Sequence, residues 1–327
     1  MGMAAWLVEE PEGAFKKIEL ARTPLREKHV RIRIAAAGVN PLDTKIRAGK
    51  APHAKQPLPA VLGLDMAGTV EEVGVGVTAF KTGDEVYGMV GGVGGLQGTV
   101  AQAIDADADL LARKPTNLSM REAAALPLAV ITSWEALIDH ANVGEGQSVL
   151  IHAGAGGVGH IAVQIALARG ARVFATVSDS KKEIVEGFGA TPIDYRAASV
   201  AEYVDANTEG KGFDMVFDTV GGATLDASFL AVKRYSGRVV SALGWGTHSL
   251  APLSFRAATY SGVFTLMPLL TGEGRAHQGW VLAQAAELVQ AGKLKPLLNQ
   301  KKFSPANIDA AYAQVENGSL GKVVIEM

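Results

Sequence analysis

The sequence predicts an α/β protein built from two parts, and three observations indicate this class. At 327 residues the chain is longer than one hydrophobic core usually supports. From residue 57 to about 105, short β-type runs are interrupted by glycine turns, as in small barrels and sandwiches. From about residue 126, helical runs alternate with short apolar strands, which indicates a parallel sheet with right-handed crossovers.

The first third of the chain carries the signature of half-buried strands. Val30–Ile34 alternates apolar and charged residues, which is the period of two expected for a strand with one buried face. Ala67–Val73 and Glu85–Val90 are further strand candidates, separated by Gly-Val-Gly and Thr-Gly-Asp turns. We therefore expect this part to be mostly β.

The second part has the sequence pattern of an open parallel sheet. A helix is predicted over Val158–Arg169 and closed by Gly170, and another over Gly279–Ala291. A strand-like segment, Lys322–Met327, ends the chain. The strands predicted for the sheet are Ser148–Ala153, Arg172–Val177, Phe213–Thr219 and Arg238–Leu243.

Composition excludes several classes of function. The formal net charge of −2 gives no electrostatic reason to expect nucleic acid or an anionic membrane as a partner. There is no cysteine, so neither a disulfide nor a thiolate metal site can form. The first residues, MGMAAWLVEEPEG, do not read as a secretory signal, and no apolar run approaches the ~18 residues of a membrane span. We expect a cytoplasmic protein.

A glycine-rich loop is the strongest local motif. Gly154, Gly156 and Gly159 follow a predicted strand and open a predicted helix in the spacing G-x-G-x-x-G. In this motif the first glycine permits the tight turn, the second lets the backbone approach a pyrophosphate, and the third lets helix and strand pack closely. Gly157 and Val158 complete the turn, and amides at the helix start would face the phosphates. The loop predicts a bound dinucleotide.

The end of the next strand bears on which dinucleotide binds. That strand is expected to finish at Val177-Ser178, and Lys181 and Lys182 follow, which suits a 2′-phosphate. Asp179 lies 20 residues after Gly159, near the distance of the acidic residue that holds the ribose of NAD. We place Asp179 in the turn, where it can cap the following helix. The sequence therefore favours NADPH over NADH.

The chain resembles a known family at these and other positions. The pattern from Gly146 to Gln164, GQSVLIHAGAGGVGHIAVQ, resembles the signature of the zinc-independent quinone oxidoreductases, the ζ-crystallin-like branch of the medium-chain dehydrogenases/reductases. It departs at Leu167, where that signature usually has a basic residue. The resemblance continues in AAAGVNPLDTKIRAG, PAVLGLDMAGTVEEVG, KTGDEVYG, REAAALPLAVITSWEAL, GFDMVFDTVGG and the closing GKVVI.

The resemblance implies an architecture and an assembly. It implies a GroES-like β domain formed by residues 1–125 and 263–327, with a Rossmann doubly wound parallel-sheet domain, residues 126–262, inserted into it. The cofactor is expected in the cleft between the two domains. The resemblance also implies a homodimer formed through edge strands, for which Gly262–Met267 is a strand candidate.

The resemblance further implies chemistry without a metal. Zinc-dependent members carry a ligating Cys where this chain has Asn40, and a ligating His where it has Leu64. Neither side chain suits the N/S coordination that catalytic zinc prefers. Direct hydride transfer from the nicotinamide is then expected, and quinones and α,β-unsaturated carbonyls are the acceptors suited to it.

The resemblance assigns roles to individual residues. Asn40, Asp43 and Lys45 are the expected catalytic group, although Asn40 and Asp43 could instead order an Asn-Pro turn, and Lys45 stands where quinone reductases often have tyrosine. Besides the glycine loop, the expected cofactor-binding residues are Thr132, Ser178, Lys181, Tyr195, Leu243, Gly244 and Lys322. No residue stands out as a general acid, and water could supply the proton.

The sequence is compatible with three functions. The leading prediction is an NADPH-dependent reductase of quinones or other conjugated carbonyls, acting on small electrophilic molecules. The alternatives are an enoyl or 2-alkenal double-bond reductase and, from a different class, a non-catalytic NADPH-binding structural or regulatory protein.

Overall fold

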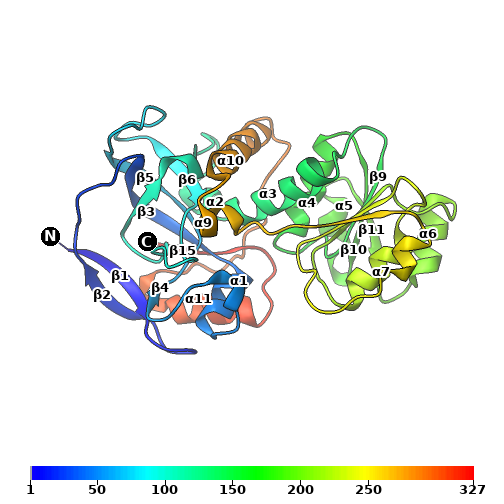
Figure 1. Cartoon of the computed structure of the whole chain (residues 1–327), viewed down its shortest axis with the longest axis horizontal. Coiled ribbons are helices and arrows are strands. Elements are labelled where there is room, and N and C mark those ends of the chain that lie inside the picture. Colours follow the sequence, from blue (N-terminus) through cyan, green and yellow to red (C-terminus); the bar gives the residue numbers. More distant parts are fainter. Residues whose placement is uncertain (1) are drawn as a thin grey trace. The chain divides into compact units, whose positions relative to one another are not determined.

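The chain is described by a computed structural model that covers residues 2–327, and it divides into two compact units (Figure 1). The first unit comprises Met1–Leu128 and Leu266–Met327, and the second comprises Ala129–Thr265. Each boundary lies three residues after the one expected from sequence, at 125/126 and 262/263. The first unit is therefore discontinuous in the chain, and the second is an insertion.

The first unit is built on antiparallel sheets. One sheet has the order β15-β3-β5-β6-β8, with β7 also pairing with β3, and a smaller one has the order β2-β1-β4. The strands are β1 Met3–Val8, β2 Lys16–Leu20, β3 His29–Val39, β4 Ala60–Val61, β5 Asp65–Val73, β6 Glu85–Met89, β7 Ala103–Asp107, β8 Leu111–Arg113 and β15 Val323–Glu326. The C-terminal strand thus returns to pair with β3, far from it in sequence.

Strand β3 shows why the alternating pattern forms a strand here. Val30, Ile32 and Ile34 are buried, and Arg33 is exposed, as the period of two predicts. Arg31 departs from the pattern: it is only 2% exposed, and its guanidinium contacts Asp105 and Glu72, at 2.7 Å each. A buried arginine is tolerated because carboxylates satisfy its donors.

Helices cover the sheets of the first unit. The predicted helix at Gly279–Ala291 is confirmed, but it begins four residues earlier, after Gly274 in the left-handed region (φ 82°). Its apolar face includes the buried Val281, Leu282 and Val289. The helices are α1 Pro41–Arg47, α2 Met120–Ala123, α9 Met267–Thr271, α10 Arg275–Gln290 and α11 Ile308–Glu316; α3 Pro127–Trp134 runs across the boundary into the second unit.

The second unit is a six-stranded sheet whose strands are all parallel, in the order β11-β10-β9-β12-β13-β14. The four strands predicted for it are confirmed, three of them ending earlier than expected. The strands are β9 Ser148–Ile151, β10 Arg172–Val177, β11 Thr191–Asp194, β12 Met215–Asp218, β13 Arg238–Ser241 and β14 Thr259–Gly262. The helices are α4 Gly159–Ala168, α5 Lys182–Glu186, α6 Val200–Thr208, α7 Ala223–Ala231 and α8 Ala251–Ser254, preceded by a π-helical turn, Glu135–His140.

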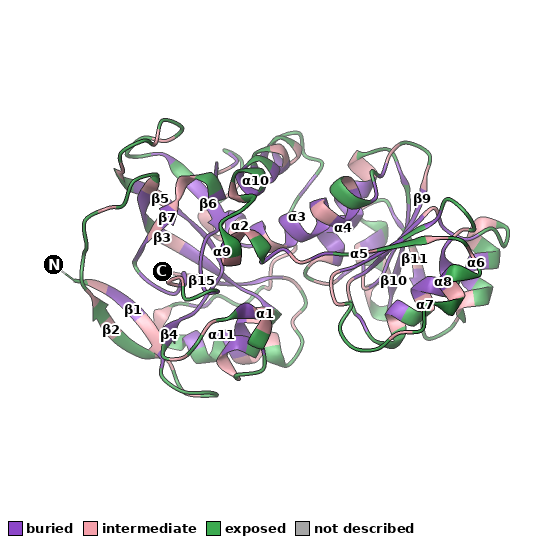
Figure 2. Ribbon diagram, in the orientation of Figure 1, coloured by how far each residue is buried: buried purple, intermediate pink, exposed green. Residues whose placement is uncertain are grey.

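The core of the second unit lies between this sheet and its helices, as the buried strands in Figure 2 show. Leu150, Val216 and Val239 come from adjacent strands and pack with Phe213 and Phe229. Strand order reverses at β9, which has β10 on one side and β12 on the other. In open parallel sheets, ligands bind outside the carboxyl ends of strands at such a switch point. The glycine-rich loop follows β9 at this place.

The strand predicted at Gly262–Met267 is wrong. Strand β14 ends at Gly262, and Met267–Thr271 forms α9, with Pro268 in its first turn. Residues 263–266, between these two elements, form neither strand nor helix, and Val263 and Leu266 are buried. A short apolar run indicates burial, and its periodicity alone does not decide the secondary structure. Strand β14 itself is one of the two edge strands of the sheet, and β11 is the other.

Within residues 2–327, no helix combines the length and the apolar composition needed to cross a bilayer.

Candidate active site and cofactor-binding cavity

The glycine-rich loop joins β9 to α4 by a turn that leaves no room for a side chain at Gly154 or Gly159. A Cβ atom added to Gly159 would lie 2.1 Å from the Ala153 carbonyl oxygen, and one added to Gly154 would lie 2.4 Å from the Ala175 Cβ. Both contacts are far inside van der Waals distance. The first and third glycines therefore let the helix approach the strand, the role the fingerprint assigns to the third.

The same loop presents backbone donors. Among the described residues, the amides of Gly157 and Val158 have no hydrogen-bond acceptor, and α4 begins without a side-chain cap. Unpaired amides at the start of a ten-residue helix, together with the positive end of its dipole, form a site for an anion. These residues fit the pyrophosphate of a dinucleotide.

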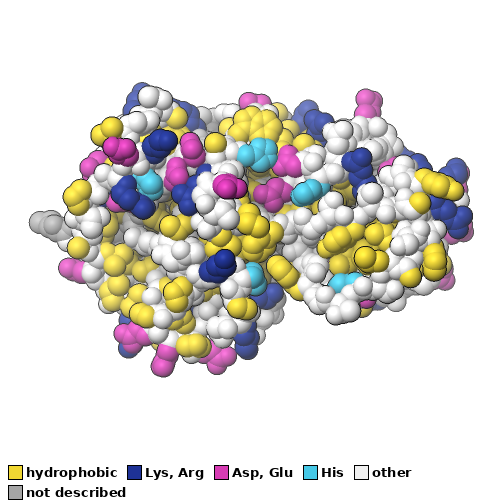
Figure 3. Space-filling model, in the orientation of Figure 1, with side chains coloured by type: hydrophobic (Ala, Val, Ile, Leu, Met, Phe, Trp, Pro, Cys, Tyr) yellow, Lys and Arg dark blue, Asp and Glu magenta, His cyan; other side chains and the backbone are white. Residues whose placement is uncertain are grey.

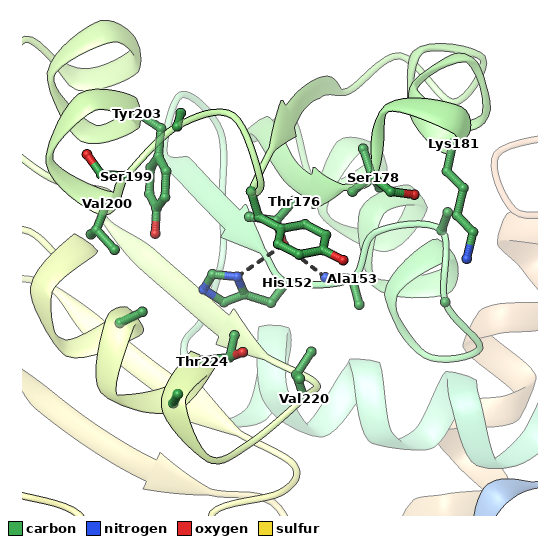
Figure 4. A pocket seen from close by; sticks show the side chains of 17 residues that line it. His152, Ala153, Thr176, Ser178, Lys181, Ser199, Val200, Tyr203, Val220 and Thr224 are labelled. Atoms are coloured by element: carbon green, nitrogen blue, oxygen red, sulfur yellow. Dashed lines mark hydrogen bonds between the residues drawn. The ribbon is translucent and has the colours of Figure 1, made fainter. Parts of the chain in front are cut away.

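A cavity of 580 Å³ opens beside this loop, lined entirely by residues of the second unit (Figure 4). Gly156 and Ala155 line it from the glycine loop, and Thr176 and Ser178 from the end of β10 and just after it. Its volume lies within the range of small-molecule and cofactor sites, about 300 to 1,000 Å³. Besides Gly156, three further predicted residues, Ser178, Lys181 and Tyr195, line the same cavity.

The charged groups near Ser178 differ in whether they are paired and in whether they line the cavity. Figure 4 shows Ser178 and Lys181 together at one end of the cavity. Lys181 forms no ion pair among the described residues, whereas Lys182 contacts the Asp179 carboxylate at 2.8 Å. Asp179 is 82% exposed and does not line the cavity. An unpaired lysine thus faces this end, and the acidic residue that would suit a ribose is already engaged.

His152 is a lining residue that sequence reasoning assigned only to the sheet. Its Nδ1 lies 3.1 Å from the Thr176 hydroxyl, which also accepts a hydrogen bond from the Ala153 amide (Figure 4). Its Nε2 is buried and has no partner among the described residues. Burial lowers the pKa of His152 to about 4, so the ring is neutral at pH 7. Its position directly before the glycine loop was the available signal.

The other predicted cofactor-binding residues of the second unit lie apart from this cavity. Thr132 is buried, and its hydroxyl lies 3.1 Å from that of Thr265, which donates to Glu135 at 3.1 Å. Leu243 donates its amide to the Ser241 hydroxyl at 3.1 Å, and a Cβ at Gly244 would lie 2.1 Å from the Tyr260 hydroxyl. Leu243 and Gly244 follow β13 at the carboxyl edge of the sheet, as expected for groups that face a ligand.

A buried polar cluster in the first unit joins three residues that are distant in sequence. Strand register explains their meeting: Val323 pairs with Val39, and Gly38 pairs with Asp65, which brings Lys322, Asn40 and Asp65 to the same end of the sheet. The Asn40 Nδ2 donates to the Asp65 carboxylate at 2.9 Å, and the Lys322 ammonium donates to the Asn40 Oδ1. All three are buried, with exposed fractions of 1% for Asn40, 0% for Asp65 and 5% for Lys322.

Asp43 lies in the first turn of helix α1, next to this cluster. Its carboxylate accepts a hydrogen bond from the Asn40 backbone amide at 2.7 Å, while the side chain of Asn40 contacts Asp65 and Lys322. Burial raises the pKa of Asp43 to about 7, and the neighbouring Asp65 carboxylate adds to this rise. Burial also raises the pKa of Asp65 and lowers that of Lys322.

The structure separates the three residues predicted to be catalytic. Asn40 and Asp43 are buried in the cluster, whereas Lys45 is exposed on α1 and lines a different surface hollow with Glu12 and Arg47. Lys322, which was expected to bind the cofactor, lies beside Asn40 in the first unit. Asp65 was missed, although it directly follows Leu64, which stands where zinc-dependent members carry a ligating His.

The two positions compared with zinc ligands hold Asn40 and Leu64. Leu64 is fully buried and cannot coordinate a metal, and Asn40 is engaged with Asp65 and Lys322. Across residues 2–327, no three His, Asp or Glu side chains gather in a way that could hold a metal ion. Asn40 and Asp65 are therefore paired with each other and with the Lys322 ammonium.

The surface carries no field of one sign on the face shown in Figure 3, where acidic and basic side chains are interspersed. This agrees with the net charge of −2.

Comparison with known proteins adds two family matches. Residues 26–116 match the alcohol dehydrogenase GroES-like domain, and residues 157–276 match the family called zinc-binding dehydrogenase. The first match lies in the first unit, and the second begins within the glycine loop, at Gly157, and covers strands β10 to β14 of the parallel sheet.

Relatives and solved structures extend the likeness over the whole chain. The chain is 35% identical to a 2-methylene-furan-3-one reductase from Solanum lycopersicum, over 92% of this chain and 72% of that one. It is 33% identical to a chloroplastic NADPH-dependent alkenal/one oxidoreductase from Arabidopsis thaliana, over 99% of this chain and 79% of that one.

Among solved structures, an alcohol dehydrogenase superfamily protein from Novosphingobium aromaticivorans is 56% identical, with a TM-score of 0.97 and 99% of both chains covered. The quinone oxidoreductase from Coxiella burnetii is 28% identical, with a TM-score of 0.81 over 100% of both chains. The glycine loop, the cavity and these similarities together show that the chain belongs to the medium-chain dehydrogenase/reductase superfamily, in the branch of the quinone oxidoreductases, and is an NAD(P)H-dependent reductase.

Proposed function

We propose that this protein uses NADPH, without zinc, to reduce quinones and other conjugated carbonyl compounds. The observation that carries the choice of NADPH is the unpaired Lys181 beside Ser178 at the cavity end, next to an aspartate already paired with Lys182. When bound, NADPH supplies the hydride. The glycine-loop amides hold its pyrophosphate, and Lys181, Ser178 and Tyr195 hold the 2′-phosphate.

We assign roles to five other residues as well. His152, neutral and with a free Nε2, lies in the same cavity and suits the adenine. Thr132, Leu243 and Gly244 are proposed to serve the nicotinamide end, and Asn40 to contact the carbonyl oxygen of the acceptor. The absence of zinc is supported by the side chains at residues 40 and 64, and metal analysis of the purified protein tests it.

Cofactor titration of variants tests the choice of NADPH. Replacing Lys181 by alanine is expected to weaken NADPH binding about 10-fold and to leave NADH binding unchanged, because one charge-assisted contact to a phosphate contributes roughly 1.5 kcal/mol. Lys182→Ala is the matched control, since that neighbouring lysine is paired with Asp179. Tighter binding of NADH than of NADPH by the unmodified protein would contradict the proposal.

The acceptor class is separated by a substrate panel. The named activities of the two plant relatives, on a 2-methylene-furan-3-one and on alkenals and enones, favour reduction of the carbon–carbon double bond next to a carbonyl. The named activity of the Coxiella burnetii structure favours quinones. Comparing naphthoquinones with 2-alkenals by kcat/KM decides which acceptor is preferred.

The oligomeric state and the cellular compartment are part of the proposal too. We propose a homodimer through β14, because this edge strand presents exposed Thr259 and Tyr260 and unpaired backbone groups to a second copy. Sedimentation that shows a monomer at micromolar concentration would reject it. A reducing compartment, the cytoplasm, is proposed because cysteine is absent.

A further inference from the structure

The side-chain amide of Asn40 has its orientation dictated by its two neighbours. An ammonium group only donates hydrogen bonds, so the Lys322 Nζ must face the oxygen of the amide. The nitrogen then faces the Asp65 carboxylate, which accepts at 2.9 Å. Exchanging the two ends of the amide would set donor against donor at Lys322 and acceptor against acceptor at Asp65.

Asp65 is itself held in place by groups other than Asn40. Its Oδ1 accepts a hydrogen bond from the Leu128 amide at 3.0 Å, and its backbone oxygen accepts one from the Thr99 hydroxyl at 3.0 Å. The Lys322 ammonium lies 3.8 Å from its Oδ2. The carboxylate thus has partners of its own besides Asn40, which favour one orientation of it.

This arrangement leaves one donor on Asn40. The Nδ2 group has two hydrogens, and Asp65 accepts one of them. The other has no acceptor among the residues that the structure describes. Capping of α1 does not use it either, because an N-cap side chain accepts hydrogen bonds through its oxygen.

We propose that Asp65 and Lys322 are positioning residues, which lock the Asn40 amide so that its second N–H is directed to the carbonyl oxygen of the acceptor. This inference rests on the proposed function, since it takes the acceptor to be a conjugated carbonyl. Negative charge develops on that oxygen when hydride is added to the conjugated system, and a donor already oriented toward it stabilises the charge without reorganisation. Lys322 thus acts through Asn40 rather than as a group that touches the acceptor.

Kinetics of single and double variants test the proposal. Asp65→Asn and Lys322→Met are each expected to lower kcat/KM about 10- to 100-fold, since a misplaced contact costs up to about 10²-fold, with cofactor affinity unchanged. Because all three residues act through one N–H, Lys322→Met is expected to have no further effect in an Asn40→Ala background. Lys322→Arg, which keeps the positive charge, is expected to recover most of the loss. Independent, multiplicative effects of Asn40→Ala and Lys322→Met would overturn the proposal.

The control for a merely structural effect is Arg31→Met, which removes another buried cation from the other end of strand β3, where it contacts Asp105 and Glu72. This variant is expected to unfold at lower urea concentration and to keep kcat/KM within about 2-fold of the unmodified protein. An equal loss of kcat/KM in Arg31→Met would show that the cluster variants act through stability, and would overturn the inference.

A readout without turnover separates this inference from the proposed function. In protein with ¹⁵N-labelled asparagine, the Asn40 side-chain amide, assigned by its loss in Asn40→Ala, is expected to give two distinct, slowly exchanging proton signals. In Lys322→Met the two signals are expected to shift and exchange faster. If this holds while the unmodified protein reduces no conjugated carbonyl, the lock stands and the proposed function fails. If the signals are unchanged in Lys322→Met, the lock fails whatever the activity.

Discussion

Replacing Gly159 by alanine is expected to weaken NADPH binding about 10- to 100-fold. The added Cβ would lie 2.1 Å from the Ala153 oxygen, 2.8 Å from the Ala153 carbonyl carbon and 3.1 Å from the Gly154 Cα. All three atoms belong to the backbone, so no side-chain rotation relieves the contact. Helix α4 must move away from the end of β9, and the amides of Gly157 and Val158 move with it. Overpacking of this kind costs about 1 to 3 kcal/mol.

The measurement is a fluorescence titration with NADPH, together with urea unfolding of the same samples. Gly144→Ala is the matched control, because a Cβ at Gly144 meets no atom within 4 Å and its φ is not positive. The control is expected to bind NADPH as the unmodified protein does. An unchanged dissociation constant in Gly159→Ala would mean that the loop does not position the pyrophosphate.

A second large effect is expected in the pH dependence of stability, through Asp43. This carboxyl is fully buried near Asp65, Lys322 and Tyr312, and its pKa is raised to about 7 from an ordinary value of 3.8. Between these values the folded state holds a proton that the unfolded state has released. The stabilisation is therefore complete below about pH 4, falls as the pH rises, and is lost above about pH 7.

Asp43→Asn isolates this contribution because an amide cannot ionise, and its oxygen can still accept the hydrogen bond from the Asn40 amide. Relative to the unmodified protein, the variant is expected to gain about 2 to 3 kcal/mol in free energy of unfolding between pH 5 and pH 8, at about 1.4 kcal/mol for each pH unit. Urea unfolding at both pH values measures it. Asp109→Asn, at an exposed aspartate of the same unit, is the control. A difference that stays constant with pH would contradict the raised pKa.

Local features of the chain were predictable because their causes are local. The glycine loop is defined by the spacing of three glycines between a strand and a helix, and steric contact at Gly154 and Gly159 explains that spacing. The strands of the second unit follow from short apolar runs bounded by turns, and β10 matches its expected bounds, Arg172–Val177. The Gly262–Met267 run was misassigned because its apolar residues indicate burial without fixing the secondary structure, and it spans the end of β14, a turn and the start of α9.

The amino-acid sequence by itself determined the dinucleotide loop, the β-rich and parallel-sheet parts of the chain, and the asparagine and leucine where zinc ligands would stand. These depend on neighbours within a few residues. Only the tertiary structure decided that Lys322 and Asp65 flank Asn40, that Lys45 is exposed, and that Lys181 is unpaired while Lys182 is not. Strand register across β15, β3 and β5 brings residues 40, 65 and 322 together, and register depends on the packing of whole sheet faces, which no short pattern contains.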